Sequence, residues 1–130
     1  NINDDWKNAG LPTNKKIILF GAKYAENYRK GGIFLKHAIK YLGEDYSKIK
    51  EKAVIVIVGN SNKKGHYKIN EFDIISLGYV SPNVMVSVYR VADVFVCPSI
   101  QDTGPLMVAE SLSCGTPVVC FPVGICLASL

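Results

Sequence analysis

Five short apolar runs are spaced along the chain, and each has the length and composition of a buried strand. They are Lys16–Gly21, Ala53–Gly59, Ile74–Tyr79, Val94–Cys97 and Val118–Phe121. The second run is apolar at every position before its glycine, so we expect it to be covered on both faces, as strands of a parallel sheet are.

Amphipathic stretches between these runs predict helices, because their apolar residues recur at helical spacing. The predicted helices are Ile33–Leu42, Asn83–Ala92 and Leu106–Cys114. Ser81 and Pro82 have the order of an N-cap and a first-turn proline, and Gly43 predicts the end of the first helix. The polar segment Asn60–Asp73 predicts no regular element.

Strands that alternate with helices over short connections predict an α/β fold with a parallel sheet and right-handed crossovers. The 130 residues suffice for one domain. We assign residues 1–15 to a linker that leads into the domain and residues 16–130 to the domain itself. The chain starts without methionine and stops soon after its last apolar run, so we expect a fragment truncated at both ends.

Composition narrows the class of protein without identifying it. With 48% hydrophobic and 20% charged residues, the chain is expected to be soluble and globular, which excludes disordered and collagen-like classes. A formal charge of +4 favours anionic ligands weakly and does not single out nucleic acid, so no nucleic-acid partner is expected.

Cysteine spacing and hydropathy bear on the compartment. The four cysteines lack zinc-ligand spacing and are expected to be buried thiols in a reducing compartment. No apolar run approaches the roughly 20 residues that span a bilayer. The polar N-terminus does not have the pattern of a secretory signal. We therefore expect a cytoplasmic protein.

Two unusual loops are expected to meet at one edge of the sheet. In an open parallel sheet, ligands bind beyond the carboxyl ends of the strands, where the strand order reverses. For the order 3-2-1-4-5, this point lies between the first and fourth strands, and the loops Gly21–Gly32 and Pro98–Pro105 then converge.

The first loop ends in Arg29, Lys30, Gly31 and Gly32. Its two basic side chains suit phosphate oxygens, and its glycines allow the backbone to approach a ligand closely. A flexible basic loop without a ligand explains the same residues.

The second loop turns directly into a helix, whose free N–H groups and positive dipole end form an anion site near Gly104. An ordinary N-cap by Asp102 or Thr103 explains this segment equally well. Glu110 lies inside this otherwise apolar helix and should be costly to bury unless a ligand hydroxyl, a lysine or a backbone group pairs with it.

Motifs of several other enzyme classes are missing. The sequence has no G-x-x-x-x-G-K-[ST] phosphate loop, no G-x-G-x-x-G after its first strand and no G-x-S-x-G nucleophile turn. His37 and His66 lie far apart without metal-ligand spacing, and each is interpreted as structural or solvent-facing.

Several segments, in the order in which they occur, resemble the C-terminal domain of retaining glycosyltransferases with two Rossmann-like domains, the GT-B architecture of family 4 type. These segments are Arg29–Gly31, Val56–Gly59, Leu77–Val80, Tyr89–Ser99 and Asp102–Val119. The resemblance runs from about Lys16 to Val123 and implies a Rossmann-like doubly wound parallel sheet, one half of a GT-B two-domain fold.

The resemblance implies roles for the matching residues. Asp102 and Glu110 occupy the family's Glu-x7-Glu motif, so Glu110 would accept hydrogen bonds from the ribose of a nucleotide sugar, and Asp102 would lie near the sugar and its phosphates. Backbone N–H groups of Gly104–Leu106 would hold the diphosphate, Lys30 would neutralise it as it leaves, and Leu77–Val80 would line the base. Lys30, Asp102 and Glu110 are the implied catalytic residues. The implied donor-binding residues are Arg29, Lys30, Gly31, Gly78, Tyr79, Asp102, Thr103, Gly104, Pro105, Leu106 and Glu110.

The implied reaction transfers a sugar from a nucleotide diphosphate sugar with retention at the anomeric carbon. It needs no metal or other cofactor, because basic side chains and backbone dipoles supply the positive charge. The acceptor, a glycan or a lipid-linked molecule, would bind an N-terminal domain that this chain lacks, so the chain alone is expected to bind the donor weakly and to transfer nothing. The full-length enzyme would be cytoplasmic, or peripherally bound at the inner face of the membrane.

The sequence departs from the family at several positions. Asp102 is one methylene shorter than the usual glutamate, and Thr103, Gly104 and Pro105 replace Gly-Phe-Gly. Aspartate and proline here are typical of a branch that makes bacterial capsular or surface polysaccharides, which implies that class of product. Ala22 stands where an arginine is common, and the ending Gly124–Leu130 lacks a second glycine.

Two alternatives remain open at this point. The first is a sugar-nucleotide-binding α/β domain of another kind, such as an epimerase type, which is not a transferase. The second is a non-enzymatic α/β interaction module in which Glu110 is paired within the protein.

Overall fold

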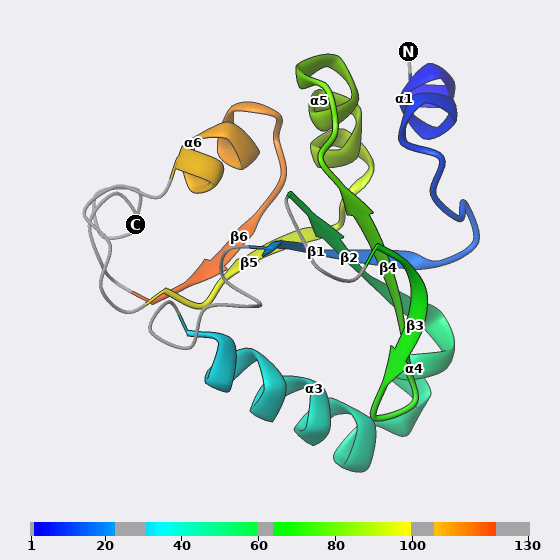
Figure 1. Cartoon of the computed structure of the whole chain (residues 1–130), viewed down its shortest axis with the longest axis vertical. Helices are drawn as coiled ribbons and strands as arrows, with labels where there is room; N and C mark the ends of the chain where they lie inside the picture. Colours follow the sequence, from blue (N-terminus) through cyan, green and yellow to red (C-terminus); the bar gives the residue numbers. More distant parts are fainter. Residues whose placement is uncertain (1, 23–30, 60–63, 100–105, 122–130) are drawn as a thin grey trace.

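A computed structural model describes residues 2–22, 31–59, 64–99 and 106–121. Six strands form one sheet in the order β3-β4-β2-β1-β5-β6 (Figure 1). The strands are β1 (Lys16–Gly21), β2 (Ala53–Val58), β3 (Gly65–Ile69), β4 (Phe72–Gly78), β5 (Val94–Cys97) and β6 (Val118–Cys120). The helices are α1 (Ile2–Ala9), α3 (Gly32–Asp45), α4 (Ser47–Lys52), α5 (Pro82–Val91) and α6 (Leu106–Ser113).

The five predicted strands are β1, β2, β4, β5 and β6, and they lie side by side in the predicted order 3-2-1-4-5. Neighbouring members of this group run parallel. All six residues of β2 are buried, as a strand covered on both faces requires. The expected doubly wound α/β fold is confirmed.

One strand was not predicted. β3 lies in the polar segment Asn60–Asp73 and pairs antiparallel with β4, which it joins through Asn70 and Glu71. Both turn residues have positive φ, 48° and 67°, the combination that a two-residue type I′ hairpin needs. β3 alternates half-buried and exposed positions, because it forms an edge of the sheet.

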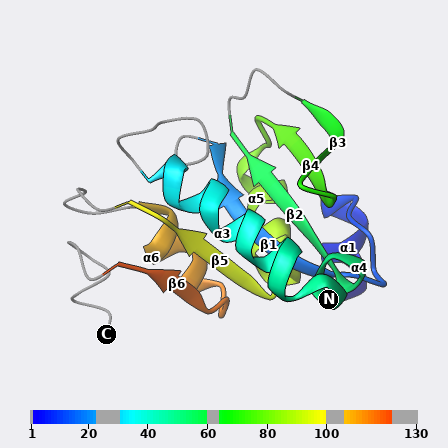
Figure 2. The ribbon, with the colours of Figure 1, turned by 90° about the horizontal axis from the view of Figure 1, so that it is seen from below.

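Helices cover the two faces of the sheet unequally. α3 lies on one face, and α1, α5 and α6 lie on the other (Figures 1 and 2). The core on the α3 side joins Leu35 and Ile39 of α3 to residues such as Ile55 and Phe72. The core on the other side joins Val88 of α5 and Val108 of α6 to β1, β2 and β5.

Helix boundaries follow local chemistry. Ser81 caps α5 by accepting a hydrogen bond from the Val84 N–H at 3.4 Å, and Pro82 begins the helix, as predicted. Gly43 does not end the helix that contains it, because α3 continues to Asp45. A Cβ at Gly43 would lie 3.2 Å from the Asn70 carbonyl oxygen, so this glycine lets the β3–β4 turn approach the helix.

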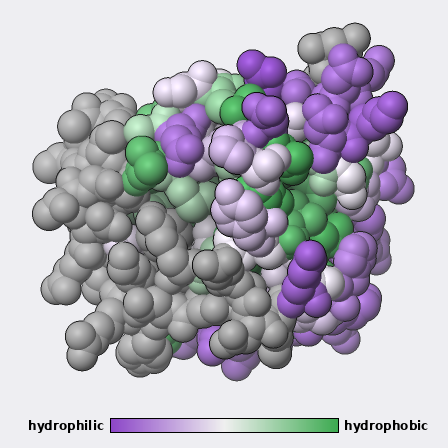
Figure 3. Space-filling view, turned by 45° about the horizontal axis from the view of Figure 1, so that its top comes forward, coloured by the Kyte–Doolittle hydropathy of each residue, from purple (hydrophilic) through white to green (hydrophobic). Residues whose placement is uncertain are grey.

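The segment 1–15, interpreted from sequence as a linker or domain-entry segment, contains the helix α1. α1 packs against α5, and its Asp5 is 8% exposed and accepts a hydrogen bond from the Ser87 hydroxyl at 3.1 Å. Arg90 lies 3.7 Å from the same carboxylate oxygen. On the face shown in Figure 3, hydrophilic side chains gather over α1, and hydrophobic ones appear in smaller areas toward the middle of the molecule.

Candidate functional site

The two loops predicted to converge do meet at their described ends. β1 and β5 are neighbours in the sheet, so the segments that follow them leave the same edge. Gly31, which precedes α3, has φ 94°, and a Cβ there would overlap the backbone carbonyl of Pro98. This contact requires glycine for two reasons, the left-handed backbone and the space.

A groove lies between α5 and α6, and Tyr79 and Val80, which follow the carboxyl end of β4, form part of its wall. We call it the α5–α6 groove; its volume is about 530 Å³, within the usual range for small-molecule sites. It is lined by Tyr79, Val80, Pro82, Met85, Val86, Tyr89, Ala109, Glu110, Ser113 and Cys114. Tyr79 and Glu110, which the sequence analysis assigned to one donor site, therefore line one groove although 31 positions separate them.

Gly78 ends β4 immediately before Tyr79, the first of the described residues that line this groove. It has φ 69°, and its carbonyl accepts a hydrogen bond from the Gly59 N–H at 2.9 Å. Tyr79 follows with 75% of its surface exposed, so its ring stands at the open side of the groove. Such an aromatic face is suited to stack against a planar base.

Glu110 is not buried, which corrects the argument that made it costly. Its helix α6 buries Val108 and Ser111, and Glu110 lies on an exposed face. The sequence argument took Glu110 to lie on a covered side of α6, whereas in the described part of the chain the buried side of this helix is the one that carries Val108 and Ser111. Glu110 nevertheless has a partner, because the Tyr89 hydroxyl donates to its Oε1 at 3.5 Å.

Tyr89 was quoted in the family motif but received no role from the sequence. It is 1% exposed and lines the α5–α6 groove. Burial, and then the charge of Glu110, raise the pKa of Tyr89 far above its usual value, so the hydroxyl stays protonated and remains a donor. No local pattern in the sequence singles out Tyr89, because its partner Glu110 lies 21 positions away.

Several predicted site residues lie outside the described residues. These are Arg29, Lys30, Asp102, Thr103, Gly104 and Pro105. Leu106 begins α6 and is 66% exposed, so the start of α6 is open to a ligand. Leu106 comes soon after Pro98 in the sequence, and Pro98 lies against Gly31. The predicted phosphate-binding region is therefore flanked by described residues on both sides.

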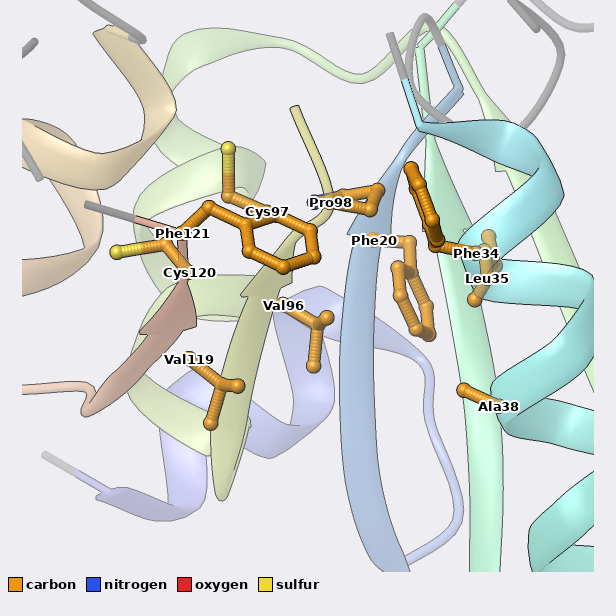
Figure 4. A pocket seen from close by; sticks show the side chains of 10 residues that line it. All are labelled: Phe20, Phe34, Leu35, Ala38, Val96, Cys97, Pro98, Val119, Cys120 and Phe121. Atoms are coloured by element: carbon orange, nitrogen blue, oxygen red, sulfur yellow. The ribbon is translucent and has the colours of Figure 1, made fainter. Parts of the chain in front are cut away.

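A second, apolar cavity lies on the α3 side of the sheet (Figure 4). Its volume is about 240 Å³, and its walls are aromatic, aliphatic or thiol side chains, including Phe20, Phe34, Val96 and Phe121. Among the described residues that line it, none is charged. Val119, at 58% exposure, and Phe121, at 41%, leave this end of the sheet open to solvent.

The histidines and cysteines are the remaining candidate groups from the sequence. His37 and His66 are both exposed, as one of the two interpretations expected. Cys97 is buried, and Cys114 and Cys120 are half-buried. Within residues 2–22, 31–59, 64–99 and 106–121, no group of three metal-ligating side chains gathers. No helix in the same ranges is long and apolar enough to cross a bilayer.

Comparison with known proteins points to one family. The sequence profile of the family described as "Glycosyl transferases group 1" matches residues 15–129. The chain is 29% identical over 126 residues to an uncharacterized glycosyltransferase of Methanocaldococcus jannaschii, covering 91% of this chain and 30% of that protein. It is 28% identical over 126 residues to a D-inositol 3-phosphate glycosyltransferase of Streptomyces bingchenggensis, covering 88% and 27%.

A solved structure shares the fold of this chain. WaaG, a glycosyltransferase involved in lipopolysaccharide biosynthesis, superposes with a TM-score of 0.69 at 16% identity, covering 98% of this chain and 34% of that one. The chain therefore spans about a third or less of the proteins it resembles.

Proposed function

The chain belongs to the glycosyl transferases group 1 family, and on that basis we propose that it is the donor-binding domain of a retaining glycosyltransferase of family 4 type. Its substrate is a nucleotide diphosphate sugar. One observation carries the proposal: Tyr79, which directly follows the carboxyl end of β4, and Glu110 of α6 line one groove of about 530 Å³. Open parallel sheets bind their ligands beyond the carboxyl ends of their strands.

The groove suits the nucleoside. Its walls are mostly apolar, with Val80, Met85 and Val86 opposite Ala109, which favours a flat base. Glu110 is the charged side chain among the described residues that line it. A carboxylate accepts hydrogen bonds and repels phosphate, so this position fits ribose hydroxyls better than a diphosphate.

The diphosphate belongs, in this proposal, at the start of α6. Free backbone N–H groups at a helix start attract anions, and Gly104–Leu106 would supply them. Lys30, next to the Gly31 that touches Pro98, would bring its ammonium group to the leaving diphosphate. Asp102 would lie on the sugar side.

The chemistry then requires stabilisation of charge on the leaving group. As the bond from the anomeric carbon to the diphosphate breaks, negative charge develops on the phosphate oxygens, and Lys30 and the helix start offset it. We propose that no metal is needed, because these groups supply the positive charge. The acceptor binds a domain outside this chain, so the chain alone binds the donor and transfers nothing.

Two acceptor classes have support. Asp102 and Pro105 resemble the branch that builds bacterial capsular or surface polysaccharides, which favours a glycan or lipid-linked acceptor and a cytoplasmic enzyme at the inner face of the membrane. The second candidate is a phosphorylated polyol, because relatives at 28% identity are named D-inositol 3-phosphate glycosyltransferases.

Calorimetric titration with uridine and guanosine diphosphates tests the donor site. We expect one of them to bind, and Glu110→Ala and Lys30→Ala each to weaken it by roughly tenfold, the loss of one charge-assisted hydrogen bond. Lys40→Ala is the matched control, since it removes an exposed lysine from the middle of α3.

Three results would count against the assignment. Binding that is unchanged by both site variants places the nucleotide elsewhere. Absence of binding favours the interaction module. Sugar transfer by the isolated chain would refute the division of labour between the two domains.

A further inference from the structure

Tyr89 is fixed by one ring contact and by two hydrogen bonds to its backbone carbonyl. It meets the ring of Phe95 edge-on, with centroids 6.4 Å apart and planes at 88°. Its backbone carbonyl accepts hydrogen bonds from the Thr116 hydroxyl and from the Ala92 N–H. Tyr89 itself is 1% exposed. Because ring and backbone are both fixed, the hydroxyl has one position available.

That position faces the Glu110 carboxylate. The Tyr89 hydroxyl lies 3.5 Å from Oε1 of Glu110, and both residues line the α5–α6 groove. A phenylalanine would pack equally well against Phe95, so packing does not explain the hydroxyl. A buried phenol hydroxyl instead needs a hydrogen-bond partner, and Glu110 is that partner.

Glu110 needs such a restraint because it is exposed. A free glutamate side chain samples many rotamers, and a ligand that requires one of them must fix it at an entropic cost. A hydrogen bond to Oε1 leaves Oε2 and the remaining lone pairs of the carboxylate free to accept from a ligand. The restraint thus orients the carboxylate before a ligand arrives.

We propose that Tyr89 is the positioning residue of the donor site, holding Glu110 so that its carboxylate selects ligands with a vicinal ribose diol. This inference rests on the proposed function, since it assumes that a nucleoside diphosphate occupies the α5–α6 groove. It assigns specificity for ribose to a pair of residues, where the family pattern alone assigns it to Glu110.

The experiment compares uridine diphosphate with its 2′,3′-dideoxy analogue by calorimetry, or the guanosine pair if guanosine diphosphate is the one that binds. For the wild type we expect the ribonucleotide to bind at least about tenfold more tightly, because a site that pairs with a hydroxyl rejects ligands lacking it. Tyr89→Phe should shrink that preference by about fivefold, the loss of one restraining hydrogen bond to a charged group, and leave the affinity for the dideoxy analogue nearly unchanged. Tyr41→Phe, on α3 across the sheet, is the control and should change neither affinity.

A merely structural role for Tyr89 gives a different result. If the hydroxyl only stabilises the groove, Tyr89→Phe weakens both nucleotides alike and the preference for ribose is unchanged, which overturns the inference. In the Glu110→Ala background, which removes the carboxylate that Tyr89 holds, Tyr89→Phe should have no further effect on the preference, because the two residues act as one unit. Additive losses would also overturn it.

Glu110→Asp provides a variant that cannot disturb the core, since Glu110 is exposed. Shortening the side chain withdraws the carboxylate from Tyr89, and the ribose preference should fall as it does in Tyr89→Phe. An unchanged preference in this variant contradicts the proposal. If the wild type binds neither nucleotide, the proposed function itself fails, which is a result distinct from binding without a change in selectivity.

Discussion

At the scale of single residues, Gly31 is the glycine at which the two loops come into contact. Its φ of 94° lies in a region that other residues enter only with strain, and any Cβ would overlap Pro98. Two separate penalties therefore apply to substitution, one from the backbone and one from the contact.

Gly31→Ala should lower the free energy of unfolding by at least about 2 kcal/mol, since the left-handed backbone alone costs about 1–2 kcal/mol and the overlap adds to it. Gly10→Ala is the matched control, because Gly10 has φ 64° and nothing lies within 4 Å of a Cβ there. Urea denaturation of both variants measures the difference. Equal losses would mean that Pro98 moves away freely and that the loops are not in firm contact.

Glu71 makes a residue-scale prediction about pH. The Lys50 ammonium, 2.5 Å from its Oε2, lowers the pKa of Glu71 below its ordinary value of 4.5. A lowered folded pKa means that the contribution to stability is present above the unfolded pKa and is lost as pH falls through the folded pKa. The wild type should have a higher free energy of unfolding than Glu71→Gln, and this difference should shrink as the solution is acidified below about pH 4.5.

Carboxyl chemical shifts measure the same pairing directly. Lys50→Gln should raise the Glu71 titration midpoint toward its ordinary value. Lys52→Gln removes an equal charge from the same helix two residues away and should move the midpoint less. Equal movement in the two variants would show that general charge, and not the pair, sets this pKa.

At the scale of elements, the attachment of α1 to α5 can be tested by substitution. Asp5 fixes it to α5 through Ser87 and lies near Arg90. Asp5→Ala should cost about 1–2 kcal/mol, because a buried hydrogen bond to a charged group is lost and the Ser87 hydroxyl loses its acceptor. Asp4→Ala removes the same first-turn charge from an exposed position and should cost less than about 0.5 kcal/mol.

Hydrogen exchange locates the effect of these two variants. Amide protons of α1 should exchange faster in Asp5→Ala than in Asp4→Ala, while β2, buried along its whole length, keeps its protection. Unchanged exchange in α1 would mean that its apolar contacts with α5 suffice to hold it.

Element by element, the sequence was informative where hydrophobicity varied strongly. Runs such as Ala53–Val58 predict strands because every side chain there is apolar. The sequence did not predict β3, because its exposed positions are His66 and Lys68. Its turn, Asn70 followed by Glu71, also lacks the Asn-Gly signature of a hairpin. The sequence did not predict α1 either, because polar residues outnumber the apolar residues of its buried side, which include Trp6 and Ala9.

The meeting of the two loops was predictable from the sequence, whereas the surroundings of Glu110 were not. Strand order placed the two loops together, since parallel strands share a carboxyl edge. The environment of Glu110 depended on which elements cover α6, and no local pattern reports that. The same holds for the hydrogen bond to Tyr89, which joins residues 21 positions apart.

At the scale of the whole molecule, nucleotide binding should add to stability. A nucleoside diphosphate at a hundred times its dissociation constant should raise the free energy of unfolding by about 2.7 kcal/mol, if it binds only the folded chain. Thermal melts with and without uridine or guanosine diphosphate measure this. At the same nucleotide concentration the shift should be smaller in Glu110→Ala and intact in Lys40→Ala; a full shift in Glu110→Ala would contradict the location of the nucleotide.

α5 has two working sides, and the residues that define them are almost adjacent. Ser87 faces the N-terminal helix, and two positions later Tyr89 faces the groove. A helix of ten residues is too stiff to move one side without the other. Because α1 and the α5–α6 groove both contact α5, a shift of α1 relative to the sheet should also displace Tyr89 in that groove.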